Sequence, residues 1–373
     1  MIKIFHLITS IHLGGSEIVA FNLAEQCKRQ QPNEYEFVVA ELHTTNDSYA
    51  QGKKRELVSK NIKTISLWKG SKRVSLIIAP FTLIYHLIQE KPQIIHSHTD
   101  LPDFVLATTL RILHFFRVKT PNIIRTIHNT ELWPTHNRMG KYTESVFIND
   151  LVVGISEASL DAYHALRVKN KLPVSQSQYL IYNGCRIPQK KEIPFKIDPK
   201  KINIAFCGRF EHQKGIDILI ERIRVINVKF GDEFLFHIIG SGTYENEVLK
   251  LSKNTPNVLV YEAVANIADK LWGFDFLIMP SRFEGLGLLS IEASYSRVPV
   301  IAAYDPGLDE TLPSDWPLRF HLESKDELLL LVEKLVNKNY NLETLKEDAF
   351  QFVSDKFSLD RMAGSYSKLY SML

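Results

Sequence analysis

The chain lacks the features of nucleic-acid-binding and disulfide-stabilised proteins. Its 373 residues include 45 Lys and Arg and 42 Asp and Glu, so the formal net charge is only +3, whereas domains that bind nucleic acid are usually strongly basic. The three cysteines, Cys27, Cys185 and Cys207, are far apart and show no metal-ligand spacing, which is typical of buried thiols in a reducing compartment. We therefore expect a cytoplasmic protein with no nucleic-acid partner.

Long hydrophobic runs are also missing. The longest run, from Ser75 to Ile88, is shorter than the ~20 residues that a membrane-spanning helix needs, and Pro80 interrupts it. The apolar start of the chain leads to Gly14-Gly15-Ser16-Glu17 instead of a small-residue cleavage site. The sequence thus predicts neither a transmembrane segment nor a secretion signal.

The chain does contain a regular alternation of short apolar runs and longer segments with helical spacing. Short runs rich in Ile, Val and Phe are typical of strands in a parallel sheet that is covered on both faces. From Ile216 onward, for example, apolar residues recur with the spacing of a helix that lies on a sheet. The predicted strands are Ile2–Ile8, Phe37–Ala40, Ile62–Leu67, Ile94–Ser97, Ile123–Ile127, Leu151–Ile155, Ile202–Cys207, Phe234–Ile239, Val258–Tyr261, Phe274–Met279 and Val298–Ala302.

This alternation predicts a doubly wound α/β fold in two domains. The segment 187–200 is rich in Pro and Lys and lacks apolar periodicity, which is typical of a linker. We therefore place an N-terminal Rossmann-like domain at residues 1–187 and a C-terminal Rossmann-like domain at residues 188–356.

Two loops that follow predicted strands are candidates for binding an anion, because ligands bind at the strand ends of open α/β sheets. Gly14-Gly15-Ser16-Glu17 precedes a helix expected near Ile18, whose N-terminus offers free N–H groups. The alternative is a tight turn in which the serine caps the helix. The loop 208–215 carries Arg209 and Lys214, two cations able to neutralise a diphosphate leaving group. A solvated basic turn is the alternative there.

Two glutamates form a third candidate site. Glu284 lies in the glycine-containing loop that follows Phe274–Met279, and Glu292 lies about one turn inside a helix expected to begin near Leu288. Carboxylates in these positions can accept hydrogen bonds from the hydroxyls of a sugar or a ribose. The alternative is that both are ordinary charged residues of a loop and an exposed helix.

Three histidines lie on or directly after strands of the first domain. His128 follows the strand Ile123–Ile127, and either a ligand contact or a structural role is open to it. His96 and His98 are two residues apart, which places both on one face of their strand. Because no carboxylate or cysteine lies at a useful spacing, we predict no metal site there.

Taken together, these motifs resemble the retaining glycosyltransferases of family 4, which have the GT-B fold. The most specific parts are the Gly-Arg…Lys-Gly loop and the two glutamates with seven residues between them. The resemblance implies two Rossmann-like domains that face each other across a cleft, with a last helix at about 357–373 that packs back on the first domain. It extends over nearly the whole chain and also includes Gly14–Glu17, His96–His98, Val153–Glu157 and Tyr182–Gly184.

The resemblance also implies a role for each site residue. Arg209 and Lys214 would hold the diphosphate of a nucleotide-sugar donor, and Glu292 would bind its ribose. Glu284 would contact the hydroxyls of the transferred sugar, and His128 would orient that sugar. The implied catalytic residues are thus Glu284, His128, Arg209 and Lys214. The other implied donor contacts are Gly14, Gly15, Gly240, Gly285, Leu286, Gly287 and Leu288.

The activity implied is transfer of a sugar from a nucleotide-diphosphate sugar to a hydroxyl acceptor with retention of anomeric configuration. A UDP-sugar is the preferred donor and a GDP-sugar the alternative. The acceptor would be a sugar, a glycolipid or a lipid-linked saccharide in the biosynthesis of bacterial surface polysaccharide, lipopolysaccharide or glycolipid. Because the chain has no Asp-x-Asp motif, we expect no metal and no cofactor.

Two basic segments are candidates for contact with a membrane. Residues 69–73 carry three cations and lead into Val74–Ile88, and residues 110–119 combine Arg111, Arg117 and Lys119 with two phenylalanines. Such segments are able to rest on an anionic bilayer, here the inner face of the cytoplasmic membrane. The alternative is a pair of core-facing helices with charged ends.

Three other functions compete with sugar transfer. A nucleotide-sugar epimerase of the same fold would share the donor site, and a catalytically silent carbohydrate-binding protein would share the fold. A catalytically silent protein is disfavoured, because the chain retains all four candidate charged residues, Arg209, Lys214, Glu284 and Glu292. A dinucleotide-dependent oxidoreductase is disfavoured because Gly240-Ser241-Gly242 is too short for its Gly-x-Gly-x-x-Gly fingerprint.

Overall fold

The computed structural model describes residues 1–148 and 150–373, which form two compact units. One unit contains residues 1–184 and 359–373, and the other contains residues 185–358. The domain boundary expected after residue 187 lies close to this division. The last helix of the chain belongs to the first unit.

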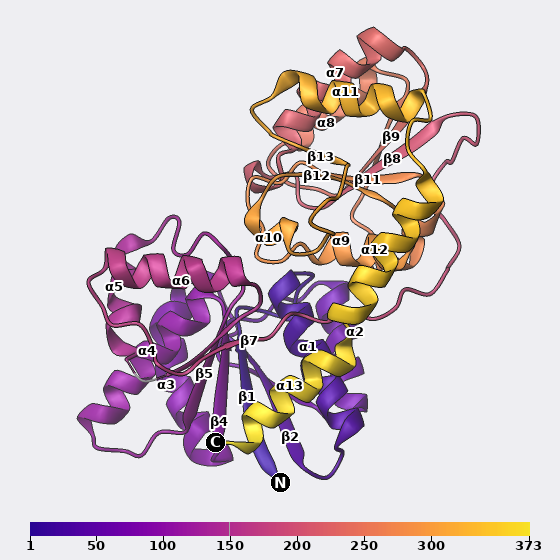
Figure 1. The fold of residues 1–373 in the computed structure, drawn as a ribbon. Coiled ribbons are helices and arrows are strands. Elements are labelled where there is room, and N and C mark those ends of the chain that lie inside the picture. Colours follow the sequence, from indigo (N-terminus) through magenta and orange to yellow (C-terminus); the bar gives the residue numbers. More distant parts are fainter. Residues whose placement is uncertain (149) are drawn as a thin grey trace. The chain divides into compact units, whose positions relative to one another are not determined.

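The first unit is a seven-stranded parallel sheet with helices on both faces (Figure 1). Its strand order is β3-β2-β1-β4-β5-β6-β7, so the order reverses between β1 and β4. This is the arrangement of a doubly wound fold, in which ligands bind beyond the carboxyl ends of the strands at the reversal. The elements are β1 (Ile2–Ile8), α1 (Gly15–Gln30), β2 (Tyr35–Glu41), α2 (Ser48–Ser59), β3 (Lys63–Ser66), α3 (Lys72–Glu90), β4 (Ile94–His98), α4 (Asp100–Phe115), β5 (Asn122–Ile127), α5 (Asn137–Val146), β6 (Leu151–Gly154), α6 (Glu157–Lys169), β7 (Gln178–Leu180) and α13 (Leu359–Ser371).

The second unit repeats this plan with six parallel strands. Its strand order, β10-β9-β8-β11-β12-β13, reverses between β8 and β11. Two short 3₁₀ segments, η1 and η2, interrupt its loops. The elements are β8 (Ile202–Cys207), η1 (His212–Lys214), α7 (Ile216–Phe230), β9 (Phe234–Ile239), α8 (Glu245–Asn254), β10 (Val258–Tyr261), η2 (Ile267–Gly273), β11 (Phe276–Met279), α9 (Leu288–Tyr295), β12 (Val300–Ala303), α10 (Pro306–Asp309), β13 (Arg319–Phe320), α11 (Lys325–Val336) and α12 (Leu342–Lys356).

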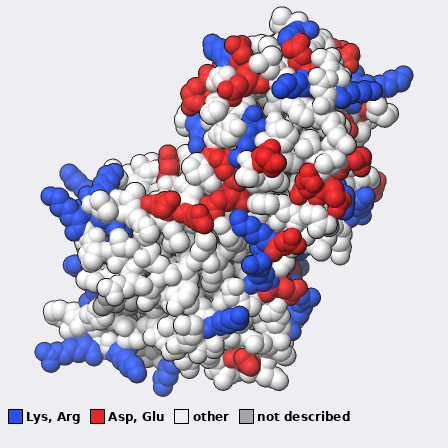
Figure 2. All heavy atoms as spheres, in the orientation of Figure 1, with Lys and Arg blue, Asp and Glu red and all other residues white. Residues whose placement is uncertain are grey.

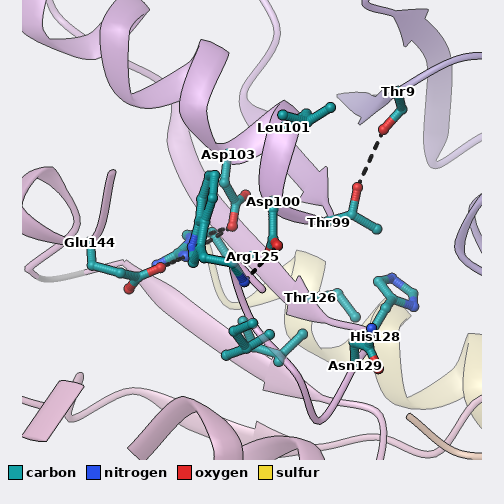
Figure 3. Close-up of a pocket in the computed structure, with 13 residues that line it drawn as sticks. Thr9, Thr99, Asp100, Leu101, Asp103, Arg125, Thr126, His128, Asn129 and Glu144 are labelled. Atoms are coloured by element: carbon teal, nitrogen blue, oxygen red, sulfur yellow. Dashed lines mark hydrogen bonds and ion pairs between the residues drawn. The ribbon is translucent and has the colours of Figure 1, made fainter. Parts of the chain in front are cut away.

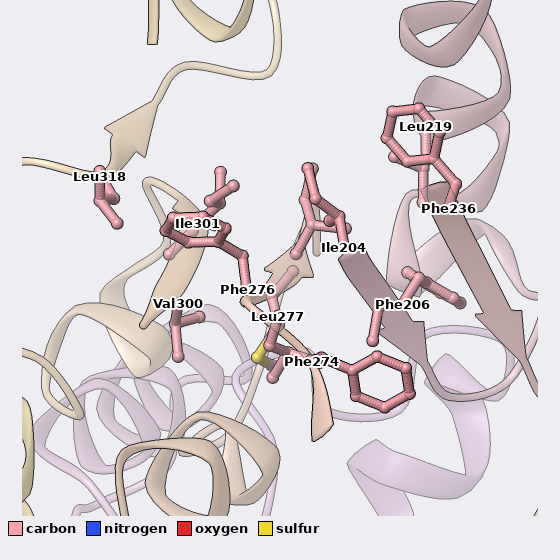
Figure 4. Close-up of a cluster of buried hydrophobic side chains, with 14 of the residues drawn as sticks. Ile204, Phe206, Leu219, Phe236, Phe274, Phe276, Leu277, Val300, Ile301 and Leu318 are labelled. Carbon is pink, nitrogen blue, oxygen red and sulfur yellow. The ribbon is translucent and has the colours of Figure 1, made fainter. Parts of the chain in front are cut away.

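Adjacent strands of the second unit supply its hydrophobic core. Ile204, Phe236, Leu277 and Ile301 come from four neighbouring strands, and each is at most 2% exposed. Figure 4 shows these side chains with Leu219 of α7, which packs on the sheet. Burial of each such side chain contributes about 1.5–3 kcal/mol, so the sheet can hold the loops at its strand ends in fixed positions.

Helix α13 joins the first unit through an amphipathic pattern. Its residues Met362, Tyr366, Leu369 and Tyr370 are at most 2% exposed and recur at helical spacing. The helix packs against α1, and the Tyr35 hydroxyl donates a hydrogen bond to the carbonyl oxygen of Ser367 at 3.1 Å. Although α13 follows the second unit in sequence, it is therefore a structural part of the first.

The predicted strands and the observed strands agree except at some ends. The bounds of β1, β8, β9 and β10 are those predicted, whereas β11 and β12 each begin two residues later. Phe274 instead ends η2, where its N–H donates to the carbonyl oxygen of Leu271. The short edge strands β7 and β13 were not predicted, because Gln178–Leu180 and Arg319–Phe320 carry no apolar run.

Candidate functional site

In the second unit, two loops pack together where the strand order reverses. Loop 208–215 follows β8, and loop 280–287 follows β11. Gly215 has a left-handed backbone with φ of 65°, and a Cβ there would lie 1.8 Å from the carbonyl oxygen of Pro280, so only glycine permits this approach. Arg282 donates to both carboxylate oxygens of Asp217 at 2.7 Å. The two loops are thus held as one surface.

Lys214 and Glu284 meet on this surface. The Lys214 Nζ lies 2.7 Å from Oε1 and 2.9 Å from Oε2 of Glu284. The Ser281 hydroxyl donates to the same Oε1 at 2.7 Å. The Glu284 side chain is only 7% exposed and the Lys214 side chain 24%. The ion pair is therefore largely shielded from solvent. A lysine and a glutamate carboxylate therefore lie side by side on this surface.

Arg209 is the second cation of the surface and is exposed. Its Nη2 donates to Oε1 of Gln213 at 2.9 Å, and Nε2 of Gln213 donates to the carbonyl oxygen of Phe283 at 3.1 Å. Gly240 lets the loop after β9 approach this region, because a Cβ there would lie 1.9 Å from the carbonyl oxygen of Gly208. Arg209 is thus positioned by neutral partners, and no carboxylate of the described residues pairs with it.

Asp305 fixes the conformation of the glutamate loop. Its Oδ2 accepts hydrogen bonds from the N–H groups of Glu284 at 3.1 Å and Leu308 at 3.0 Å. Gly307 allows the two loops to touch, because a Cβ there would lie 2.1 Å from the carbonyl oxygen of Glu284. Sequence analysis gave Asp305 no role, although an Asp before a Pro at the first position of a helix is a common N-cap signal.

The segment from Gly285 to Leu288 ends at the N-terminus of α9. The helix begins at Leu288 as predicted, and its cap, Gly287, has φ of 64°. No side chain of the described residues caps this helix, so its first N–H groups can face a ligand anion.

Glu292 lies on the same helix, and no described residue hydrogen-bonds to its carboxylate. The pKa of Glu292 is raised from its ordinary 4.5 to about 7, mainly by burial; the charge of Arg186 opposes the rise and that of Asp269 adds to it. A partly buried carboxylate with no hydrogen-bond partner among the described residues is suited to accept hydrogen bonds from a ligand.

The raised pKa predicts that Glu292→Gln stabilises the free protein above neutral pH. The unfolded chain ionises near pH 4.5 and the folded chain near pH 7, so wild-type stability falls as pH rises between these values and then stays lower. The variant lacks this loss, on the order of 1–3 kcal/mol. Its melting temperature should therefore exceed that of wild type at pH 8, and the difference should shrink towards pH 5.

The matched control for this prediction is Glu323→Gln, which alters an exposed glutamate of the same unit. Its melting temperature should equal that of wild type at both pH values. An equal melting temperature of Glu292→Gln and wild type at pH 8 would show that the carboxylate is not destabilised by burial.

In the first unit, the Gly14-Gly15 turn leads directly into α1. The helix begins at Gly15, not near Ile18, and Gly14 is its cap. The interpretation of Ser16 as the cap is wrong, because the Ser16 hydroxyl donates to Oε2 of Glu17 at 2.7 Å. The Glu17 side chain packs closely over Gly14, since a Cβ there would lie 2.2 Å from the same Oε2. No side chain of the described residues caps α1, so its first N–H groups stay available.

A pocket of about 190 Å³ opens beside the carboxyl ends of β4 and β5 (Figure 3). Thr9, Thr99 and His128 contribute to its lining. Thr99 has φ of 77° and ψ of 168°, a conformation that is strained for a β-branched residue. Strain of this kind is concentrated at functional sites, which makes the pocket a second candidate site.

The floor of this pocket contains a buried ionic network that sequence analysis missed. Arg125 donates to Asp103 at 2.9 Å and Glu144 at 2.6 Å, and its Nη1 lies 3.2 Å from Asp150. Arg167 also donates to Glu144. Each guanidinium is at most 1% exposed, so removing one partner would leave an unpaired buried charge. The network fixes the ends of β5 and α4 behind the pocket.

His128 is tied to the pocket wall by another histidine. Its Nε2 lies 3.0 Å from Nδ1 of His98, whose Nε2 lies 2.8 Å from Nδ1 of His6. His96 and His98 share one face of β4, as predicted, and His6 joins them from β1. The sequence gave no signal for His6, because only the pairing of β1 with β4 brings it there.

Comparison with known proteins identifies the family. Residues 13–184 match the family described as Glycosyltransferase Family 4, and residues 201–335 match Glycosyl transferases group 1. The chain is a family 4 glycosyltransferase. An uncharacterized glycosyltransferase of Methanocaldococcus jannaschii is 26% identical to it, over 97% of this chain and 95% of that protein. An O-antigen biosynthesis glycosyltransferase of Escherichia coli is 24% identical, over 100% of this chain and 98% of that protein.

Solved structures show that this glycosyltransferase has the GT-B fold. HepE of Anabaena, solved in complex with UDP-glucose, is similar with a TM-score of 0.79 and 16% identity, over 100% of both chains. Sucrose-phosphate synthase of Thermosynechococcus elongatus gives a TM-score of 0.77 at 15% identity, over 100% of this chain and 99% of that chain. At these identities the likeness concerns the fold alone.

Within each unit, the candidate residues predicted from the sequence lie near the carboxyl ends of the strands. Ligands generally bind there in folds of this type. Arg209, Lys214 and Glu284 lie on the joined loops of the second unit, and Glu292 lies on the helix that follows them. The Gly14-Gly15 turn and His128 lie at the strand ends of the first unit.

Proposed function

We propose that this glycosyltransferase transfers a sugar from a UDP-sugar, with retention of anomeric configuration and without a metal, to a hydroxyl of a growing surface saccharide or glycolipid. The observation that carries the proposal is the Lys214–Glu284 pair beside Arg209, at the strand reversal of the second unit. The complex of HepE with UDP-glucose and the O-antigen relative support the choice of donor and pathway class.

The roles of the charged residues follow from where charge develops. When the sugar leaves, negative charge accumulates on the diphosphate, and Arg209 and Lys214 supply two cations to stabilise it. Lys214 would then exchange Glu284 for a phosphate oxygen, which frees the carboxylate to accept hydrogen bonds from the sugar hydroxyls. Glu292 would accept the ribose hydroxyls.

Retention would come from attack on the face that the leaving group occupies. The bond from C1 to the phosphate oxygen breaks, the bond from C1 to the acceptor oxygen forms on the same face, and the acceptor proton passes to the departing phosphate oxygen. Glu284 is engaged by Lys214 and Ser281, and Asp305 is engaged by two backbone N–H groups. Neither carboxylate is presented as a free nucleophile, which favours this route over a covalent intermediate.

Thermal stability in the presence of nucleotide sugars tests the proposal. UDP-, GDP-, ADP- and dTDP-sugars would be added with EDTA, because a ligand present at a hundred times its dissociation constant stabilises the native state by about 2.7 kcal/mol. A shift for a UDP-sugar that is lost in Arg209→Ala supports the proposal. A shift that requires a divalent metal, or no shift with any nucleotide sugar, contradicts it.

Product analysis separates sugar transfer from the competing functions. A transferase releases UDP only when an acceptor is present and forms a glycoside whose anomeric proton coupling matches that of the donor. An epimerase would alter the donor sugar without an acceptor. Binding without turnover would indicate a silent carbohydrate-binding protein.

We also propose that α3 and α4 rest on an anionic bilayer. One side of α3 packs on the core, but its opposite side exposes Ile77 (69%), Phe81 (61%), Tyr85 (60%) and Ile88 (58%), which lie on one stripe. The neighbouring α4 ends at Phe115, and both Phe115 and the following Phe116 are exposed. The core-facing and membrane interpretations of these helices are therefore compatible.

Charge supports this choice of partner. Exposed Lys and Arg flank the apolar stripe, while residues 67–89 and 104–130 contain no Asp or Glu. In Figure 2 the lower left of the molecule, where Figure 1 places α3 and α4, is largely white with blue at its edge. Each cation near an anionic surface contributes about 1 kcal/mol. No described helix is long and apolar enough to cross a bilayer, so the contact would be peripheral.

Vesicle sedimentation tests the membrane contact. The protein should sediment with phosphatidylglycerol-containing vesicles at low salt, less at high salt, and not with pure phosphatidylcholine. A triple serine variant at Ile77, Phe81 and Tyr85 should lose binding, whereas Val228→Ser, which alters a residue 90% exposed in the other unit, should not. Wild-type binding in the triple variant, or self-association in place of vesicle binding, contradicts the proposal.

A further inference from the structure

The histidines behind the first-unit pocket form a hydrogen-bonded row. His6 Nδ1 lies 2.8 Å from His98 Nε2, and His98 Nδ1 lies 3.0 Å from His128 Nε2. Both ring nitrogens of His98 are therefore committed to other histidines. His6 and His98 are at most 1% exposed, whereas His128 lies at the pocket. The row thus connects the interior of the sheet to a ligand-facing side chain.

Sheet pairing explains why the rings line up. His6 on β1 lies opposite His96 on β4, and His98 lies opposite Thr126 on β5. His96 is held separately, because its Nδ1 lies 2.8 Å from the Tyr370 hydroxyl and its Nε2 lies 2.6 Å from the Thr126 hydroxyl. Its ring stacks on His98 with centroids 4.1 Å apart, so the position of His98 is fixed from the side as well.

All four rings are neutral near physiological pH. Burial lowers the pKa of His6 and of His128 to about 3 and that of His96 and His98 well below the ordinary value. A neutral imidazole carries one N–H and one bare nitrogen. Each N···N contact in the row therefore contains one proton, and the proton position on one ring decides the position on the next.

Only two proton arrangements satisfy both contacts. In the first, His6 donates from Nδ1, His98 donates from Nδ1 to His128, and His128 keeps its proton on Nδ1. In the second, the direction reverses, and His6 must carry its proton on Nε2. That Nε2 is buried and has no hydrogen-bond partner among the described residues. Because a buried N–H without an acceptor is rarely tolerated, the first arrangement is the stable one.

We propose that His98 is a positioning residue that holds His128 as the Nδ1–H tautomer, so that His128 offers a hydrogen-bond donor to an oxygen of the sugar substrate. The inference rests on the proposed function for the identity of that oxygen. The tautomer itself follows from the protein alone. No described residue accepts a hydrogen bond from His128 Nδ1, which leaves this donor for the ligand.

A metal centre is the competing use of this cluster, because ligand atoms of His6, His96 and His98 lie within 4.8 Å of one another. Coordination would break the contact between His6 and His98 and one contact of His96. Among the described residues, the cluster contains no carboxylate or thiolate, so a bound divalent ion would keep its full charge in the sheet interior. The hydrogen-bonded row therefore accounts better for the geometry.

Nitrogen NMR of protein labelled with ¹⁵N-histidine tests the tautomer without any substrate. Two-bond proton–nitrogen correlations distinguish Nδ1–H from Nε2–H rings, and the His128 signals are those lost in His128→Gln. The wild type should show His128 as Nδ1–H. In His98→Leu, and in the more conservative His6→Phe, a fraction of His128 should change to Nε2–H. A wild-type Nε2–H signal, or tautomers unchanged in both variants, overturns the proposal.

Kinetics test the consequence for transfer. The amide nitrogen of asparagine lies at the same side-chain position as Nδ1 of histidine, so His98→Asn can still donate to His128. We expect His98→Leu to lower kcat/KM for the donor roughly tenfold, the loss of one hydrogen bond, with the acceptor KM unchanged, and His98→Asn to retain most activity. Equal losses in both variants indicate a purely structural role. Stoichiometric zinc in the purified protein also overturns the proposal, whereas the predicted tautomer in a protein without transferase activity refutes only the proposed function.

Discussion

Replacing Glu284 with glutamine is expected to lower the rate of sugar transfer on the order of 10²–10³-fold while UDP affinity stays within a few-fold of wild type. The magnitude is that of removing one preorganised electrostatic contact from an active site. Glutamine keeps the size of the side chain and its bond to Ser281, but its amide cannot pair with Lys214 or accept sugar hydroxyls at both of its terminal atoms. Steady-state transfer rates and calorimetric UDP binding measure the two quantities separately.

The structure supplies matched controls for this variant. Glu323→Gln removes an exposed carboxylate of the same unit and should leave transfer unchanged. Ser281→Ala removes one hydrogen bond to Glu284 and should have a smaller effect than the loss of the carboxylate. If Glu284→Gln transfers sugar at the wild-type rate, the carboxylate does not act on the donor, and the role assigned to it is wrong.

The fold could be predicted because local signals and sheet topology agree. Buried parallel strands read as continuous apolar runs, which is why the bounds of β8 and β9 follow from sequence. Doubly wound order then places the loops after β8 and β11 side by side. The glycines at 215 and 240 permit backbone contacts that no other residue allows. The sequence shows that these positions are glycine, but only the structure shows which backbone atoms they contact.

The partners of the site residues could not be predicted because they are distant in sequence. Lys214 and Glu284 are 70 residues apart and meet only across two loops, so the sequence indicated each as a candidate but not their contact. His6 reaches His98 only through the pairing of β1 with β4. Arg125 binds carboxylates from α4, from α5 and from the residue before β6, and no periodicity signals a buried cation. Long-range polar networks thus stayed hidden where apolar patterns were informative.

Arg209→Ala and Lys214→Ala are each expected to weaken UDP binding about 10- to 100-fold, but with different effects on the free protein. Hydrogen bonds to charged groups are worth about 1.5–3 kcal/mol, which corresponds to this range. Arg209 is exposed and held by the neutral Gln213, so its loss should leave the melting temperature unchanged. Loss of Lys214 leaves the nearly buried Glu284 carboxylate without its cation, so the melting temperature should fall.

Arg224→Ala controls for the general loss of positive charge, because Arg224 is an exposed arginine of α7 in the same unit. Its UDP affinity should equal that of wild type.

Removing Glu284 as well should reverse the instability of Lys214→Ala, since the double variant buries no unpaired charge, but it should not restore UDP binding. This separation of stability from affinity is what distinguishes a phosphate-binding lysine from a lysine that serves only to neutralise Glu284. If the double variant regains wild-type UDP affinity, Lys214 acts on the carboxylate alone, and the diphosphate depends on Arg209 and the N-terminus of α9.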